Sequence, residues 1–71
     1  MKTGILVPDG AQKRIDIRFT CEEYYGGLHC GTTMDVWLDD HWVPTRIEMC
    51  GTKWYLVGVK TESILGLKVR I

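Results

Sequence analysis

The apolar residues of this chain alternate with polar residues in short runs, and this alternation constrains the fold more than any other feature. In the clearest run, residues 14–19, the side chains of Ile15, Ile17 and Phe19 fall on one face, whereas Asp16 and the two arginines of the run fall on the other. Helical periodicity is nearly absent, and glycine- or proline-containing turns separate the runs. The pattern predicts an all-β fold whose strands bury one face and leave the other in solvent.

The runs 34–38 and 42–50 are predicted to form a hairpin across residues 39–41. The core face of this hairpin is expected to hold Met34, Val36, Leu38, Val43, Thr45, Ile47 and Met49. The opposite face is expected to hold Trp37, Trp42, Arg46 and Glu48. Pro44 has no N–H to donate to a ladder, so its strand should lie at an edge there or form a bulge.

The rest of the chain completes a small β domain. Three further strands are expected, with connecting segments between them: strands at 4–7, 54–59 and 67–71, a turn at 8–10, a long loop at 20–30 and a single helical turn at 63–66. The run 54–59 is apolar on both faces, which favours a central strand. We predict a single domain spanning residues 1–71, an antiparallel barrel of five or six strands, strongly bent and SH3-like, with a plain curved sheet as the alternative.

Charge is unevenly distributed along the sequence even though nine basic and nine acidic residues cancel. The segment 20–42 holds five carboxylates and neither lysine nor arginine, whereas the segments on both sides carry an excess of positive charge. The zero net charge argues against attraction of the whole molecule to nucleic acid or to a membrane surface. A local acidic contact surface remains compatible with it.

The acidic segment also contains four of the seven aromatic residues. Carboxylates around an aromatic centre are typical of complementary interfaces, which predicts a protein partner of basic character. The predicted contact residues are Glu22, Glu23, Tyr24, Tyr25, Trp37, Asp39, Asp40, Trp42 and Arg46. Arg46 is included because it is expected to project beside the two tryptophans, and a solvated pair with Glu48 is the alternative. For the segment as a whole, the alternative is a solvated acidic loop.

The basic carboxy-terminal half supports a second hypothesis, a small barrel that binds RNA or single-stranded DNA. Its positive charge would come from Lys53, Lys60, Lys68 and Arg70. Its stacking surfaces would come from Tyr24, Tyr25, Trp37, Trp42 and Trp54. Most of these aromatic residues lie in the acidic segment, which repels phosphate, and tryptophans in so small a domain more often belong to the core. Protein binding is therefore the preferred hypothesis.

Three cysteines and two histidines raise the question of a zinc site, because thiolate and imidazole are preferred zinc ligands. Cys21, Cys30 and Cys50 form no Cys-x-x-Cys pair, and the adjacent His29 and Cys30 would point to opposite faces of a strand. We therefore expect no metal or other cofactor, and cysteines that are buried and unreactive.

Catalysis is not expected either, so the protein is predicted not to be an enzyme. A chain of 71 residues buries only about 60% of its unfolded surface, which leaves little room for a pocket that excludes water. His29 and Cys30 are the residue types of a base and a nucleophile, but adjacent side chains seldom meet.

The expected location is the cytoplasm. No run approaches the roughly 18 apolar residues of a membrane helix, and residues 1–8 lack the apolar run of a signal peptide. An odd number of cysteines suits a reducing compartment, although a bridge between Cys21 and Cys30 stays open. We expect a monomer, or a homodimer paired through a strand edge at Pro44 or at the terminal strand.

Four stretches together carry a resemblance to a known family: Glu-Tyr-Tyr-Gly-Gly-Leu-His-Cys-Gly at 23–31, Trp-Val-Pro-Thr-Arg-Ile-Glu at 42–48, Trp-Tyr-Leu-Val-Gly at 54–58 and Gly-Leu-Lys-Val-Arg-Ile at 66–71. The chain resembles, over nearly its whole length, a family of short uncharacterised bacterial proteins, a domain of unknown function from Gram-positive bacteria and their mobile elements. The resemblance implies a cytoplasmic protein and, by association with mobile elements, a role in regulation or in interference with host machinery.

Overall fold

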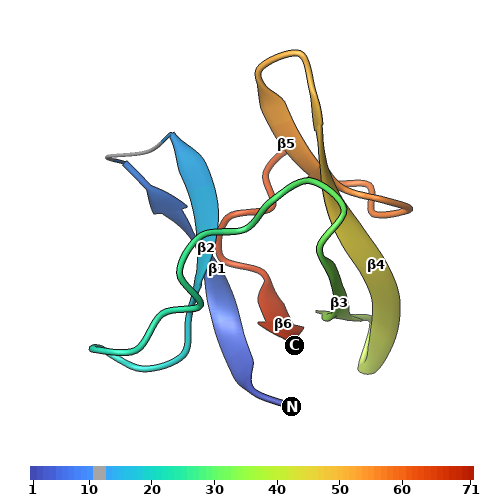
Figure 1. Cartoon of the computed structure of the whole chain (residues 1–71). Coiled ribbons are helices and arrows are strands. Elements are labelled where there is room, and N and C mark those ends of the chain that lie inside the picture. The colour runs from blue at the N-terminus through green and yellow to red at the C-terminus, as the bar shows by residue number, and fades with distance from the viewer. Residues whose placement is uncertain (11–12) are drawn as a thin grey trace.

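The computed structural model describes residues 1–10 and 13–71, which form one antiparallel sheet of six strands in the order β2-β1-β6-β3-β4-β5 (Figure 1). The strands are β1 (Thr3–Asp9), β2 (Arg14–Arg18), β3 (Thr33–Leu38), β4 (His41–Cys50), β5 (Lys53–Leu56) and β6 (Lys68–Arg70). The expected all-β, antiparallel class is confirmed. None of the described residues forms a helix, so the described part of the chain has no helix that could cross a membrane.

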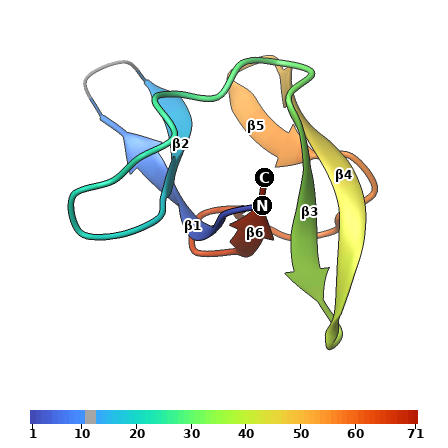
Figure 2. The same cartoon turned by 60° about the horizontal axis from the view of Figure 1, so that its bottom comes forward.

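The sheet is strongly curved but open, because β2 and β5 are its two ends in the strand order. The long loop between β2 and β3 runs across this opening (Figure 1 and Figure 2). Its Leu28 N–H donates to the carbonyl of Ile15 in β2 at 2.9 Å, and its Gly31 N–H donates to the carbonyl of Ile47 in β4 at 2.8 Å. A loop, rather than a pair of strands, therefore bridges the two sides, and the expected closed barrel is not confirmed.

The predicted hairpin is present as β3 and β4. Asp39 and Asp40 have φ of 50° and 65°, the left-handed values that a two-residue turn of type I′ requires. His41 belongs to β4 rather than to the turn. Pro44 lies where β4 has β3 on one side only, because β5 pairs only with residues 47–50. The missing N–H of Pro44 is thus tolerated at a local edge, as predicted.

The core lies on the concave side of the sheet and draws on every strand. The buried apolar side chains are Leu6, Ile15, Ile17, Leu28, Met34, Val36, Ile47, Leu56, Ile64 and Val69. Two of them, Leu28 and Ile64, come from connecting segments rather than from strands. These segments therefore complete a core that the short strands alone would leave uncovered.

The segment 54–59 does not form a central strand, contrary to the sequence prediction. β5 ends at Leu56 and lies at one end of the sheet, and the following Val57 N–H donates to the carbonyl of Arg46 at 3.0 Å. The apolar run reflects packing of Trp54 and Val59 against the core from an edge position. The central strand is instead β6, between β1 and β3, so the terminal strand offers no free edge for a dimer.

In place of the helical turn expected at 63–66, the chain forms a β-turn over residues 64–67. The Leu67 N–H donates to the carbonyl of Ile64 at 3.2 Å, and Gly66 has a φ of 88°. A positive φ at the third position of such a turn is typical of type II and suits glycine. The expected turn at 8–10 begins later than predicted, because β1 continues through Asp9.

Asp16 is buried, although the alternation placed it on the solvent face. The loop that crosses the opening folds over this position and leaves the residue 7% exposed. One carboxylate oxygen, Oδ1, accepts from the N–H groups of Ile17 at 2.8 Å, Gly26 at 3.0 Å and Gly27 at 2.8 Å. Both glycines have positive φ, 108° and 98°, which turns their N–H groups toward the same oxygen. The carboxylate thereby anchors the loop.

Candidate functional site

The convex face of the sheet carries a row of side chains that crosses four strands. Residues that pair directly across an antiparallel ladder project to the same side of the sheet. Ile5 pairs with Lys68, Trp37 pairs with Trp42, and the β3–β6 register sets Trp37 opposite Lys68. Ile5 is 40% exposed and Trp37 is 36% exposed, so the row offers large apolar side chains to solvent.

Two cations from β6 lie over the two tryptophan rings. The rings of Trp37 and Trp42 have centroids 5.1 Å apart and an interplanar angle of 69°, an edge-to-face arrangement. The Lys68 Nζ is 5.2 Å from the centroid of Trp37 and 5.8 Å from that of Trp42. The Arg70 Cζ is 4.5 Å from the centroid of Trp42. At these distances the ring quadrupoles attract both cations, which fixes their side chains against the aromatic surface.

The two cations differ in their ionic partners. Arg70 donates from Nε to Asp35 Oδ2 at 2.8 Å, and the two side chains are 33% and 19% exposed. Lys68 has no carboxylate within 4.0 Å among the described residues. Its ammonium therefore faces solvent above two aromatic rings. We call the surface formed by Ile5, Asp35, Trp37, Trp42, Lys68 and Arg70 the tryptophan-cation face.

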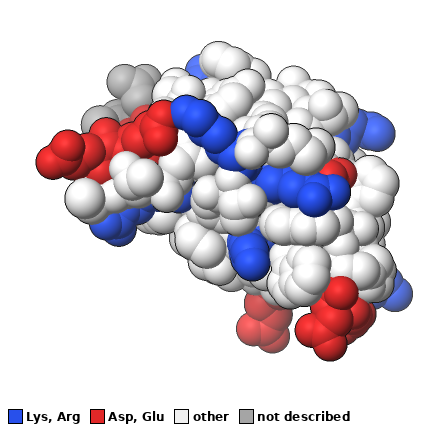
Figure 3. Space-filling model, turned by 90° about the horizontal axis from the view of Figure 1, so that it is seen from below, with Lys and Arg blue, Asp and Glu red and all other residues white. Residues whose placement is uncertain are grey.

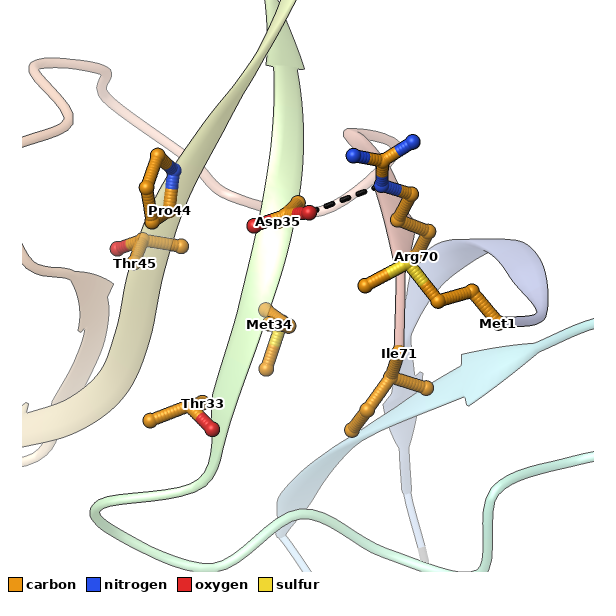
Figure 4. Close-up of a pocket in the computed structure, with 8 residues that line it drawn as sticks. All are labelled: Met1, Thr33, Met34, Asp35, Pro44, Thr45, Arg70 and Ile71. Carbon is orange, nitrogen blue, oxygen red and sulfur yellow. Dashed lines mark hydrogen bonds and ion pairs between the residues drawn. The ribbon is translucent and has the colours of Figure 1, made fainter.

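A surface pocket of about 360 Å³ adjoins the ion pair of Arg70 and Asp35 (Figure 4). Its lining residues are Met1, Thr33, Met34, Asp35, Pro44, Thr45, Arg70 and Ile71. The pocket can receive a side chain beside the ion pair of Arg70 and Asp35. The tryptophan-cation face therefore combines an aromatic pair, of which Trp37 is exposed and Trp42 is half-buried, with two cations and a hollow at its border.

The five acidic residues of segment 20–42 do not lie together, because Asp35 belongs to the tryptophan-cation face and the other four form two separate groups. Asp39 and Asp40 lie in the turn that follows Trp37, whereas Glu22 and Glu23 lie beyond β2, at the other end of the strand order. Figure 3 shows basic side chains across the middle of this side of the molecule and acidic side chains gathered at two separate ends. The predicted acidic-aromatic surface is thus divided into two groups with cations between them.

Tyr24 and Tyr25 accompany the glutamates rather than the tryptophans. They are 50% and 44% exposed, and Tyr24 forms an isolated bridge with Arg18 of β2. The Glu23 carboxylate pairs with the ammonium of Lys2. The second acidic group therefore also contains two exposed aromatic side chains, at a different place on the sheet.

Arg46 is not the cation that lies beside the tryptophans. It projects from the same face of β4 as Trp42 but four residues further along, about 13 Å at 3.3 Å per residue. Its Nε donates to Glu48 Oε2 at 3.0 Å, the solvated pair that was the alternative reading of the sequence. The alternation of Lys68, Val69 and Arg70 shows that two cations share a face, but the sequence does not reveal which strands flank them.

The remaining residues of the nucleic-acid hypothesis lie elsewhere. Lys53 pairs with Cys50 at the turn between β4 and β5, and Lys60 is exposed in the segment between β5 and β6. Trp54 packs against the core, and its Nε1–H donates to the carbonyl of Lys13 at 3.4 Å. Of the four basic residues in that set, only Lys68 and Arg70 therefore lie beside Trp37 and Trp42.

The three cysteines are all exposed and free, so the expectation that they are buried is wrong. Within the residues that the structure describes, no three His, Cys, Asp or Glu side chains are grouped to hold a metal ion. The Nδ1 of His29 lies 3.0 Å from Nη1 of Arg14. This contact ties the loop to β2.

Comparisons with known proteins place the chain in a family. A crystal structure of a protein from Ruminococcus gnavus is 51% identical, covers 99% of this chain and 100% of its own, and superposes with a TM-score of 0.91. None of the curated proteins matches the chain. The family model of a domain of unknown function, DUF5348, matches residues 4–71. The chain therefore belongs to the DUF5348 family.

Proposed function

We propose that this domain is a non-catalytic protein-binding module and that the tryptophan-cation face is its contact surface. The observation that carries the proposal is the row in which Lys68 lies over both Trp37 and Trp42 on a solvent-facing side of the sheet. Tryptophan and arginine are the most frequent energetic anchors of protein interfaces, and charged groups commonly surround such anchors. The adjoining pocket adds a place for a partner side chain.

The openness of the face supports a binding role over a catalytic one. Trp37 is 36% exposed, and the pocket lined by Asp35 and Arg70 opens at the surface, so water reaches the polar groups. Catalytic groups gain most of their strength in sites that exclude water. An exposed aromatic side chain, by contrast, gains binding energy when a partner covers it.

The test is selection of peptides on immobilised protein from a random library. A length of about 12 residues suffices, because ten extended residues at roughly 3.3 Å each span the 32 Å long axis of the molecule. Trp37→Ala should weaken binding of the selected peptides by about tenfold or more, the loss typical of an anchor residue. Tyr55→Ala is the matched control, since Tyr55 is 39% exposed on β5 and lies outside the face. Peptides that bind Trp37→Ala as well as they bind the wild type would show that the contact surface lies elsewhere.

Binding of single-stranded nucleic acid is the second candidate function. It is favoured by one observation, the two cations that lie over Trp37 and the half-buried Trp42. This arrangement resembles surfaces where bases stack and cations follow the phosphates. The two acidic groups at the ends of this side oppose it. Fluorescence anisotropy with labelled oligo(U) and oligo(dT) at low salt measures this binding. If the wild type binds the oligonucleotide and the double variant Lys68→Glu with Arg70→Glu does not, the result would favour this candidate.

Two finer expectations accompany the main proposal. We propose that the curved sheet is an open variant of a small SH3-like barrel. The loop between β2 and β3 supports this, because it is hydrogen-bonded to both β2 and β4. We also propose that the protein works in the cytoplasm of Gram-positive bacteria and is carried by mobile elements. Three exposed free thiols suit a reducing compartment, and quantitative alkylation of freshly purified protein tests whether they are reduced.

A further inference from the structure

The charges around the tryptophan-cation face alternate in sign across this side of the molecule. Its centre carries Lys68 and Arg70. Asp39 and Asp40 lie on one side of this centre, in the β3–β4 turn. Glu22 and Glu23 lie on the other side, in the loop that follows β2. Figure 3 shows acidic side chains gathered at two ends of this side, with basic side chains and one smaller acidic group between them. A partner with complementary charges has the reverse order.

Lys68 is the group at which a partner charge gains most. Its ammonium is held over two rings, and within the described part of the chain it has no carboxylate to neutralise it. A carboxylate that approaches from solvent forms a charge-assisted hydrogen bond with an ammonium that the rings have already positioned. The remainder of the same partner segment can cover Trp37 and Ile5, which are exposed on the two sides of Lys68 in the row.

Arg70 offers a second contact for the same kind of group. Its ion pair with Asp35 uses Nε, and the two Nη groups extend beyond that pair at the border of the pocket (Figure 4). The Asp35 carboxylate and the Trp42 ring restrict the guanidinium. A restricted guanidinium loses little conformational freedom when it binds a second acceptor.

The carboxylates at the two ends of this side of the molecule distinguish between classes of partner. A uniformly anionic strand that lies across the whole face meets repulsion at Asp39 and Asp40 and at Glu22, whereas Glu23 is already paired with Lys2. A second copy of the same face brings cations against cations at the centre. A protein segment with carboxylates in its middle and lysine or arginine on both sides matches all three regions. We infer that the partner is a protein segment of this charge order, an inference that rests on the proposed function.

Two synthetic peptides of identical composition test the inference. One has glutamates beside a leucine at its centre and lysines at its ends, and the other has the lysines at the centre and the glutamates at the ends. Isothermal titration calorimetry should show binding of the acid-centred peptide that is about fivefold tighter or more. Lys68→Glu should remove or reverse this preference, whereas Lys60→Glu, an exposed lysine away from the face, should leave it unchanged.

A second pair of variants tests the acidic ends. Asp39→Asn with Asp40→Asn removes two charges and keeps residue types that tolerate the positive φ of the turn. The double variant should bind the acid-centred peptide more weakly, because it lacks the negative charges that attract the terminal lysines of the peptide. Circular dichroism of each variant confirms that it is folded before its affinity is compared.

The outcomes separate the inference from the proposed function. If both peptides bind equally and Trp37→Ala abolishes binding, the face is the contact surface and the inferred charge order is wrong. If Trp37→Ala leaves the binding unchanged, the proposed function itself is wrong. If oligo(U) displaces the acid-centred peptide and binds the protein more tightly than the peptide does, the partner class is nucleic acid and the inference is overturned.

Discussion

Asp16 illustrates at the scale of one residue how a charge comes to be buried in this domain. Its Oδ1 accepts three backbone N–H groups, two of them from the glycine pair of the crossing loop. Asp16→Ala should lower the free energy of unfolding by about 2–4 kcal/mol, because it leaves buried N–H donors without an acceptor. Asp16→Asn retains an acceptor oxygen and should lose less.

Urea unfolding followed by tryptophan fluorescence measures these losses. Glu62→Ala, at an exposed position in the segment before β6, is the control and should change stability by no more than about 0.5 kcal/mol. An Asp16→Ala protein as stable as this control would show that the three hydrogen bonds contribute nothing.

The burial of Asp16 could not be predicted from the alternation of the sequence. Alternation reports which side of a strand a residue occupies, but it does not report whether a distant segment later covers that side. The glycine pair at 26–27 was the available signal, because two successive glycines permit the positive φ values that aim both N–H groups at one oxygen.

At the scale of elements, the close approach of β1 and β2 depends on Gly4. A methyl group added there would lie 2.6 Å from the carbonyl oxygen of Arg18 and 2.6 Å from Cγ2 of Ile17. Gly4→Ala should therefore push the two strands apart and cost about 1–3 kcal/mol of stability. Gly10→Ala is the matched control, since nothing lies within 4 Å of the added atom. Thermal unfolding compares the two, and equal midpoints would contradict the steric argument.

The elements differ in how well the sequence predicted them. The β3–β4 hairpin followed from alternation and turn residues, which act over a few neighbouring positions. The place of β6 between β1 and β3 depends on pairing between distant segments, which alternation does not encode. For the same reason the preferred hypothesis placed Trp37 and Trp42 on one face but gave them Arg46 as cationic neighbour, whereas Lys68 and Arg70 appeared only in the nucleic-acid alternative.

At the scale of the whole molecule, the core depends on side chains from the loops. Leu28 is fully buried although it lies in the loop that bridges the opening of the sheet. Leu28→Ala should cost about 2–4 kcal/mol, a large part of the roughly 4–10 kcal/mol expected of a domain of this size. Leu65→Ala, at a position 44% exposed, should cost little. Chemical denaturation of the two variants tests whether the loop belongs to the cooperative unit.

The central position of β6 also has a kinetic consequence. The β2–β1 hairpin and the β3–β4–β5 meander each consist of sequence neighbours, whereas β6 joins them by pairing Arg70 with Thr3 across almost the full chain. Contacts of such long sequence separation make folding slow and place this step late. Because β6 also supplies Lys68 and Arg70, a partly folded chain lacks the cations of the tryptophan-cation face, and recognition is reserved for molecules that have finished folding.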